Sequence, residues 1–199
     1  KYLNFEIKKN DIIGIVGESW SGKSTLIDLI SGLLVPTGGK IFINNVEFSG
    51  SNLKLFQSKI GIVSQQVFLS DRTIKENIAF GYEEKEINFD QINKSINESS
   101  LYNFISHLKE GINTKVGERG VQLSGGETQR IGIARALYNN PEVIIMDEAT
   151  SALDSNTEKN IINTISNLKG SKTLIIIAHR LSTIKVCDTI FFMKNGKII

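Results

Sequence analysis

The chain has 199 residues, 40% hydrophobic and 22% charged, an ordinary globular composition that excludes collagen-like, disordered and low-complexity proteins. Lys and Arg number 23 against 21 for Asp and Glu, so the net charge of +2 lacks the basic surplus of a dedicated nucleic-acid-binding protein, and no nucleic-acid partner is expected. The single Cys187 excludes an internal disulfide framework, and we expect it to be a small buried apolar residue. No apolar run approaches the 18 or so residues that cross a bilayer.

The first predicted strand, Ile12 to Val16, leads into a glycine-rich loop and a helix. The loop matches the G-x-x-x-x-G-K-[ST] pattern, in which backbone N–H groups wrap phosphates. Lys23 places a positive charge on the β- and γ-phosphates, and the Ser24 hydroxyl ligates Mg²⁺. An apolar stripe of Leu26, Leu29, Ile30 and Leu33 predicts the helix, ending before Pro36. The expected nucleotide-binding residues here are Gly17, Glu18, Ser19, Trp20, Ser21, Gly22, Lys23, Ser24 and Thr25.

Two short apolar runs, Ile41 to Ile43 and Ile60 to Val63, predict the next strands. Gln65 and Gln66 follow the second of them, at the edge where a ligand of an α/β sheet binds. From about Asp71 to Thr114 the chain is polar and rich in Asn and Glu, without a strong strand run. This stretch is predicted to be a mainly helical insert.

A second potential phosphate site lies at Ser124, Gly125 and Gly126, which open a helix predicted to end at Pro141. A helix start carries free N–H groups and a positive partial charge, and the Ser124 hydroxyl adds a donor. If both phosphate sites bind one nucleotide, they either meet within a chain or come from two chains arranged head to tail. Taken alone, this feature is an ordinary helix cap.

The strand from Val143 to Met146 ends in Asp147 and Glu148. At the carboxyl edge of the sheet, Asp147 is placed to hold Mg²⁺ through its water shell, and Glu148 to polarise an attacking water. A helix is predicted from the natural cap Asp154 to about Leu168. His179 follows the strand Thr173 to Ala178, a position suited to a γ-phosphate contact, and a last strand covers Ile190 to Met193. Strands that alternate with helices in this way predict an α/β fold with a mostly parallel sheet.

Taken in order, these motifs resemble the nucleotide-binding domain of the ABC transporter family, over nearly the whole chain. The matching features are the phosphate loop, Gln65, the Leu-Ser-Gly-Gly signature at 123–126, Asp147-Glu148, Ser151-Ala152-Leu153-Asp154 and His179. Three further stretches resemble the exporter branch. They are Phe68 to Ile78, Thr114 to Gly120, which is similar to the loop that touches transmembrane coupling helices, and His179 to Ile184.

The resemblance implies a P-loop NTPase core with a mostly parallel sheet, an antiparallel N-terminal β portion and a helical subdomain insert. Residues 1–199 are then one ABC ATPase domain truncated at both ends, with the core at about 1–65 and 131–199 and the helical subdomain at about 66–130. We expect a longer polypeptide with transmembrane segments upstream. The domain is expected at the cytoplasmic face of a membrane, such as a bacterial inner membrane.

The same resemblance implies a dimer that holds two Mg-ATP, with a second domain that is identical or related. Each ATP is held by the phosphate loop of one subunit and by Ser124 to Gly126 of the other. Glu148 is the general base or the carboxylate that orients the water, His179 contacts the γ-phosphate, and Gln65 reports the state of Mg²⁺ and water to the transmembrane part. Asp154 belongs to the loop that links the two sites. ATP hydrolysis would then power transport.

Three positions depart from the family pattern. Trp20 stands where the phosphate loop usually has Gly, and a left-handed backbone there would cost a non-glycine residue about 1 kcal/mol. Glu127 replaces the usual Gln of the signature and adds a negative charge near the partner's nucleotide. The aromatic residue that stacks on adenine is expected before residue 1, because Tyr2 is too close to the phosphate loop.

Two alternatives remain open. One is a soluble ABC ATPase that acts on DNA or ribosomes; a long coiled-coil insertion of the DNA-repair kind is absent between Lys23 and Ser124. The other is a regulatory module that binds nucleotide with impaired hydrolysis. Trp20 and Glu127 keep this alternative open, and the presence of Glu148 and His179 counts against it.

Overall fold

Continuous runs of Ile and Val form the central sheet of the computed structural model, which describes residues 3–117, 120, 123–147, 154–178 and 180–199. Its strand order is β4-β5-β6-β1-β7-β8, and the first five strands pair in parallel, whereas β8 is antiparallel to β7. All five predicted core strands are confirmed to within a residue at either end. The strands are β1 (Ile12–Gly17), β4 (Ile60–Val63), β5 (Val143–Asp147), β6 (Thr173–Ile177), β7 (Thr189–Lys194) and β8 (Lys197–Ile198).

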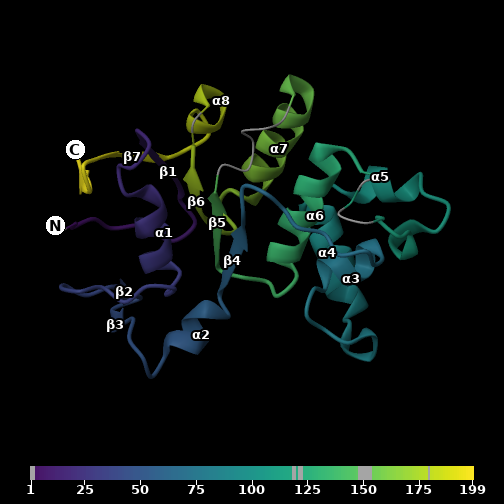
Figure 1. Cartoon of the computed structure of the whole chain (residues 1–199), viewed down its shortest axis with the longest axis horizontal. Helices are drawn as coiled ribbons and strands as arrows, with labels where there is room; N and C mark the ends of the chain where they lie inside the picture. The colour runs from purple at the N-terminus through teal and green to yellow at the C-terminus, as the bar shows by residue number, and fades with distance from the viewer. Residues whose placement is uncertain (1–2, 118–119, 121–122, 148–153, 179) are drawn as a thin grey trace.

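Helices cover both faces of this sheet, because successive side chains of a strand point to opposite sides (Figure 1). Ile13 and Ile15 of β1 face α1 (Lys23–Ile30), where they meet Leu26 and Ile27. Ile12 faces the other way, toward α6 (Gly125–Leu137) and α7 (Ser155–Leu168). The α1 helix and the α6–α7 pair therefore lie on opposite faces of the sheet.

A second lobe is built from helices between β4 and α6, at the right of Figure 1. Its apolar core includes Ile74, Ile78, Ile92 and Leu101. To this core α6 adds Ile131 and Ala134, and Tyr138 joins it directly after the helix. The insert is helical, as predicted. Because α6 contributes to the cores of both lobes, the division of the domain at residues 66 and 130 stays a prediction. The elements are α3 (Ile74–Ile78), α4 (Phe89–Glu98), α5 (Tyr102–Ser106) and the 3₁₀ turns Glu84–Glu86 and Gly111–Asn113.

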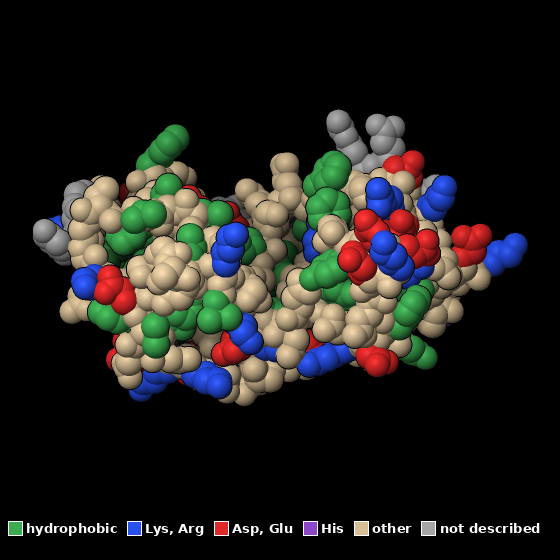
Figure 2. Space-filling view, turned by 90° about the horizontal axis from the view of Figure 1, so that it is seen from below, with side chains coloured by type: hydrophobic (Ala, Val, Ile, Leu, Met, Phe, Trp, Pro, Cys, Tyr) green, Lys and Arg blue, Asp and Glu red, His purple; other side chains and the backbone are tan. Residues whose placement is uncertain are grey.

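A small antiparallel hairpin joins β2 (Phe42–Ile43) to β3 (Val46–Glu47), and α2 (Leu53–Gln57) follows it. Asn44 and Asn45 at its turn both have positive φ, as a two-residue hairpin turn requires. Phe42 and Val46 are exposed, and hydrophobic side chains show over this end of the molecule in Figure 2. Together with the main sheet, the hairpin confirms the predicted fold class.

The predicted end of the first helix was wrong. The structure ends α1 at Ile30, and Leu33, expected on the apolar stripe, is 65% exposed. Gly32 adopts a left-handed φ of 72°, and the N–H groups of Leu33 and Leu34 both return to the carbonyl of Asp28. The helix therefore ends at the glycine, although three more apolar residues, Leu33, Leu34 and Val35, follow it.

The remaining helix, α8 (Leu181–Ile184), is a single turn. In the described part of the chain the longest helix is α7, with 14 residues, and no helix there has the length and apolar character that a membrane span requires. Cys187 is only half-buried beside the α6–α7 core, and burial raises the pKa of its thiol to about 11. It therefore stays protonated at neutral pH.

Candidate nucleotide-binding site

The polar residues predicted for the site follow the carboxyl ends of neighbouring parallel strands. Asp147 closes β5 and lies in register with Ile177, the last residue of β6. On the other side of β6, β1 ends at Gly17 and leads into the phosphate loop. Gln65 comes two residues after the end of β4, the strand beyond β5. The topology thus brings the phosphate loop, Asp147 and Gln65 to one edge of the sheet, where ligands of α/β folds bind.

The backbone of the phosphate loop is shaped by two glycines. Gly22 caps α1 with a φ of 103°, a conformation that side chains rarely adopt. Gly17 lies so close to β7 that a Cβ atom there would come within 2.3 Å of the Met193 carbonyl oxygen. A side chain at Gly17 would push the loop away from β7, and one at Gly22 would strain the backbone at the start of α1, so the glycines fix the path of the loop.

The side chain of Lys23 is folded into this loop and only 8% exposed. Its Nζ donates hydrogen bonds to the carbonyl oxygens of Gly17, at 2.7 Å, and Glu18, at 2.9 Å. These two contacts hold the ammonium group against the backbone of the loop. A positive charge is therefore in place before any ligand arrives.

Ser21 supplies a further indication that the loop is built for a ligand. Its Oγ is buried and has no hydrogen-bond partner among the described residues. Buried polar atoms are nearly always paired, so an unpaired hydroxyl inside a glycine-rich loop fits a phosphate oxygen as its missing partner. Ser24 and Thr25, in the first turn of α1, are exposed to solvent. The residues present therefore fit a nucleotide phosphate.

Trp20 stands in the same loop with a left-handed φ of 65° and a fully exposed indole. The backbone conformation expected from the family's glycine is thus retained, and the strain falls on a residue with a Cβ atom. The indole points into solvent and contributes no burial to offset that strain.

We expect Trp20→Gly to raise the free energy of unfolding by about 1 kcal/mol, because glycine adopts φ near +65° without a Cβ clash. Urea denaturation of both proteins measures the difference. Ser19→Gly is the matched control, since Ser19 is also exposed in the loop but has no positive φ, and there glycine should destabilise by about 0.5 kcal/mol. Equal effects of the two substitutions would rule out backbone strain at Trp20.

The helix start proposed as a second phosphate site is well formed. Ser124 caps α6: its Oγ accepts from the Glu127 N–H at 3.3 Å, and the Glu127 carboxylate accepts from the Ser124 N–H at 2.7 Å. The Glu127 charge is thus turned back onto its own helix. Ser124 and Gly125 are exposed, whereas Gly126 is buried against α7, where a Cβ atom would lie 2.2 Å from Thr157 Cγ2. Gly126 therefore also serves close helix packing.

Asp154 caps α7, as predicted, by accepting a hydrogen bond from the Thr157 N–H at 3.1 Å. This cap places Asp154 at the start of the helix that Gly126 packs against. Glu148 and His179, together with Ser151 to Leu153 and Glu118 to Arg119, lie outside the described residues. Their predicted roles stay predictions.

One connection near the site was missed by the sequence reasoning. The Glu158 carboxylate of α7 accepts hydrogen bonds from Arg180 and Ser182, at the start of α8. The bond from Ser182, helped by Arg180, lowers the pKa of Glu158 although burial opposes it. The helix that follows Asp154 is thereby tied to the residues that follow His179. The partners are 22 and 24 residues apart, so no local spacing signals the contact.

A parallel sheet, a phosphate loop between its strand β1 and helix α1, and an acidic residue at the end of β5 define an α/β nucleotide-binding domain of the P-loop class. The model of one family, described as ABC transporter, matches residues 1–151. The chain belongs to the ABC transporter family, which confirms the predicted membership.

Known relatives place the chain among exporter components. It is 44% identical over 197 residues to the leukotoxin translocation ATP-binding protein LktB of Mannheimia glucosida, covering 99% of this chain and 28% of that protein. It is 41% identical over 199 residues to the multidrug resistance protein pgp-1 of Caenorhabditis elegans, a match that covers 100% of this chain and 15% of that protein. A solved bacterial Atm1-family ABC exporter with ATP bound matches with a TM-score of 0.86 and 38% identity, covering 98% of this chain and 34% of that one. The chain thus spans about a third or less of each.

Proposed function

We propose that this chain is the ATP-binding and ATP-hydrolysing domain of an ABC exporter. The observation that carries the proposal is the gathering of the phosphate loop, Asp147 and Gln65 at the carboxyl edge of one parallel sheet. The buried Lys23 ammonium and the unpaired Ser21 hydroxyl support an anionic ligand in the loop. The relatives named above are translocation and multidrug resistance proteins, which favours export over the soluble alternative.

Mg-ATP is the proposed cofactor, with Ser24, Gln65 and Asp147 as the residues that would hold the metal. In the described part of the chain no three His, Cys, Asp or Glu side chains group into a metal site of their own. Mg²⁺ usually takes one or two protein ligands and completes its shell with phosphates and water. Bound Mg²⁺ would neutralise charge that develops on the phosphates, while Glu148 orients the attacking water.

We further propose that two copies of the domain, or this chain and a related one, form a head-to-tail dimer around two nucleotides. The support is that α1 and α6, the helices that follow the phosphate loop and Ser124, pack on opposite faces of the sheet. The sequence left open whether the two phosphate sites meet within one chain or come from two chains. This packing favours the second arrangement, in which Ser124 contacts the nucleotide bound by the other chain.

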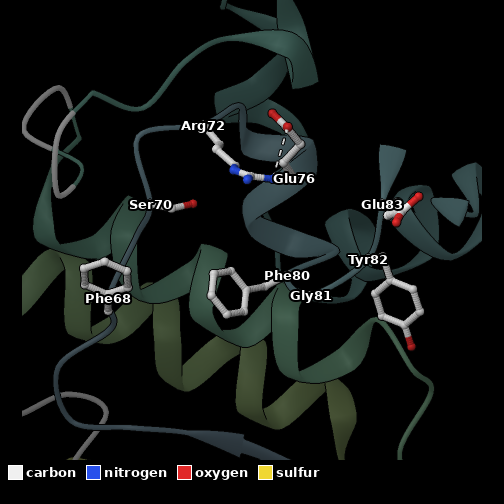
Figure 3. Close-up of a pocket in the computed structure, with 8 residues that line it drawn as sticks. All are labelled: Phe68, Ser70, Arg72, Glu76, Phe80, Gly81, Tyr82 and Glu83. Carbon is white, nitrogen blue, oxygen red and sulfur yellow. Dashed lines mark ion pairs between the residues drawn. The ribbon is translucent and has the colours of Figure 1, made fainter. Parts of the chain in front are cut away.

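A hollow in the helical lobe is the proposed contact for the transmembrane partner. It measures about 440 Å³ and carries three aromatic side chains (Figure 3). The stretch Thr114 to Gly120 resembles the loop that touches coupling helices in exporters, and its first residues bond to the backbone beside the hollow. The Ile74 N–H donates to the Thr114 carbonyl oxygen, and the Val116 N–H donates to the Arg72 carbonyl oxygen. We propose a short transmembrane-domain helix as its occupant, which would place this domain at the cytoplasmic face of a membrane. The lining residues are Phe68, Ser70, Arg72, Glu76, Phe80, Gly81, Tyr82 and Glu83.

A complementation experiment tests both hydrolysis and the shared site. Lys23→Ala and Ser124→Ala each damage one half of the proposed composite site, so each variant alone should hydrolyse ATP slowly. In a mixed dimer the intact phosphate loop of one variant meets the intact signature of the other. Mixing the two should therefore restore Mg²⁺-dependent phosphate release to a sizeable fraction of the wild-type rate. No recovery on mixing, with an active wild type, would overturn the head-to-tail dimer, and an inactive wild type would overturn hydrolysis.

A further inference from the structure

A polar network joins the signature helix α6 to the segment that leads away from Gln65. The Arg135 guanidinium, near the end of α6, donates from Nε to the Asn77 carbonyl oxygen at 2.8 Å and from Nη1 to the Phe68 carbonyl oxygen at 2.9 Å. Its Nη2 donates to Asn77 Oδ1 at 3.3 Å. These three acceptors are neutral, and burial lowers the pKa of Arg135 although the group remains charged at neutral pH. Arg135 is half-buried, and a partly desolvated cation that is held by three acceptors tolerates little movement of them.

Asn77 is the centre of this network and is fully buried in α3. Its Oδ1 also accepts from the Ser70 N–H at 2.9 Å and from the Ser70 hydroxyl at 3.2 Å. Its Nδ2 donates to the carbonyl oxygens of Ser70, at 3.0 Å, and Thr73, at 3.1 Å. All polar atoms of the amide are therefore used, and the backbone of residues 68–73 cannot move independently of α3 and α6.

The network lies directly behind the hollow of the helical lobe. Phe80 presents its ring to the hollow in Figure 3, and the Arg135 Cζ atom lies 4.9 Å from the centre of that ring. Phe68, Ser70 and Phe80 all line the hollow, while the carbonyl of Phe68 and the backbone of Ser70 are held by Arg135 and Asn77. Anything that fills the hollow thus presses on groups that are fixed to α6.

From Arg135 the helix runs back to its start at Gly125, ten residues and about 15 Å away at 1.5 Å per residue. We propose that Arg135 is a positioning residue, which sets the placement of the signature residues Ser124 to Gly126 according to the position of the 68–70 segment. This rests on the proposed function, in which Ser124 to Gly126 meet the nucleotide of the other chain. Arginine is required because its rigid fork reaches three acceptors at once, whereas lysine offers a point charge on a flexible stem.

The test uses the protein that contains this chain, at full length, with Arg135→Lys and, as control, Ile131→Val. Ile131 is fully buried on the same helix, so its substitution loosens packing without touching the network. The first readout is hydrogen exchange of the Glu127 and Thr128 amides, whose N–H groups donate to Ser124. We expect Arg135→Lys to speed this exchange about tenfold more than Ile131→Val does. Phe80→Leu removes only the ring over the guanidinium, and it should also speed hydrogen exchange at these two amides.

The second readout separates positioning from folding. With Arg135→Lys we expect kcat for ATP hydrolysis to fall about tenfold while the Kd for Mg-ATP stays within about twofold, because the phosphate loop is unaffected. The inference would be overturned if the exchange rates of the Glu127 and Thr128 amides in both Arg135→Lys and Phe80→Leu equalled those in the Ile131→Val control. A wild type without hydrolysis would overturn the proposed function, and the exchange comparison would still decide the role of Arg135.

Discussion

Glu148→Gln is expected to reduce ATP hydrolysis at saturating Mg-ATP by about 10² to 10⁴-fold, the usual contribution of a positioned general base. Glutamine has the size of glutamate, but its amide cannot accept a proton from the attacking water. Glu148 directly follows Asp147, the residue that closes β5 at the ligand-binding edge of the sheet. The Kd for Mg-ATP should change by less than about threefold, because the phosphate loop supplies the binding contacts.

Glu142→Gln is the matched control for this prediction. Glu142 precedes β5 at the opposite edge of the sheet and forms a half-exposed ion pair with Lys59 at 3.4 Å. The same chemical change there should leave the rate within about twofold, since exposed pairs contribute little. If Glu148→Gln keeps more than a tenth of the wild-type rate, another group activates the water and the family's role for Glu148 does not apply here. If the wild type itself is inactive, the result favours the alternative of a regulatory module that binds nucleotide without hydrolysing it.

The core of the fold could be predicted from the sequence because its signals are local. Four of the parallel strands are short runs rich in Ile and Val, and β1, β4, β5 and β6 lie where those runs lie. The fifth, β7, is an apolar run with two Phe residues and a largely exposed surface. The start of α7 was predictable from Asp154, a common cap residue. The end of α1 was also marked, by Gly32, but an apolar stripe that continued to Leu33 obscured it.

The predictable part of the site is likewise the part that lies on single strands and turns. The phosphate loop and Asp147 each follow a recognisable strand, and the parallel sheet brings them together. The bond from Arg135 to Asn77 spans 58 residues, and the one from Arg180 to Glu158 spans 22. Such contacts depend on how two lobes or two helices pack, and no spacing within either segment reports that. The left-handed backbone of Trp20 was predictable only through the glycine that the family places there.

Removing the Lys23 side chain should have the second large effect. We expect Lys23→Ala to raise the Kd for Mg-ATP by about 100-fold, because a charge-assisted hydrogen bond to phosphate contributes about 3 kcal/mol. The ammonium is already held in the loop by the carbonyl oxygens of Gly17 and Glu18, so little conformational entropy is lost when a phosphate binds. Trp20 is the single tryptophan of the chain and lies in the same loop, so its fluorescence can report the titration.

Lys194→Ala is the control for this titration. Lys194 ends β7 one residue beyond Met193, which pairs with Gly17, so this exposed lysine lies beside the loop without entering it. Removing its charge should change the Kd by no more than about twofold, since exposed charges are screened by salt. A Kd that rises equally in both variants would mean that net positive charge at this edge attracts the nucleotide. A Kd unchanged in Lys23→Ala would mean that its ammonium does not meet the phosphates. Only a large effect confined to Lys23 is consistent with a nucleotide bound inside the phosphate loop.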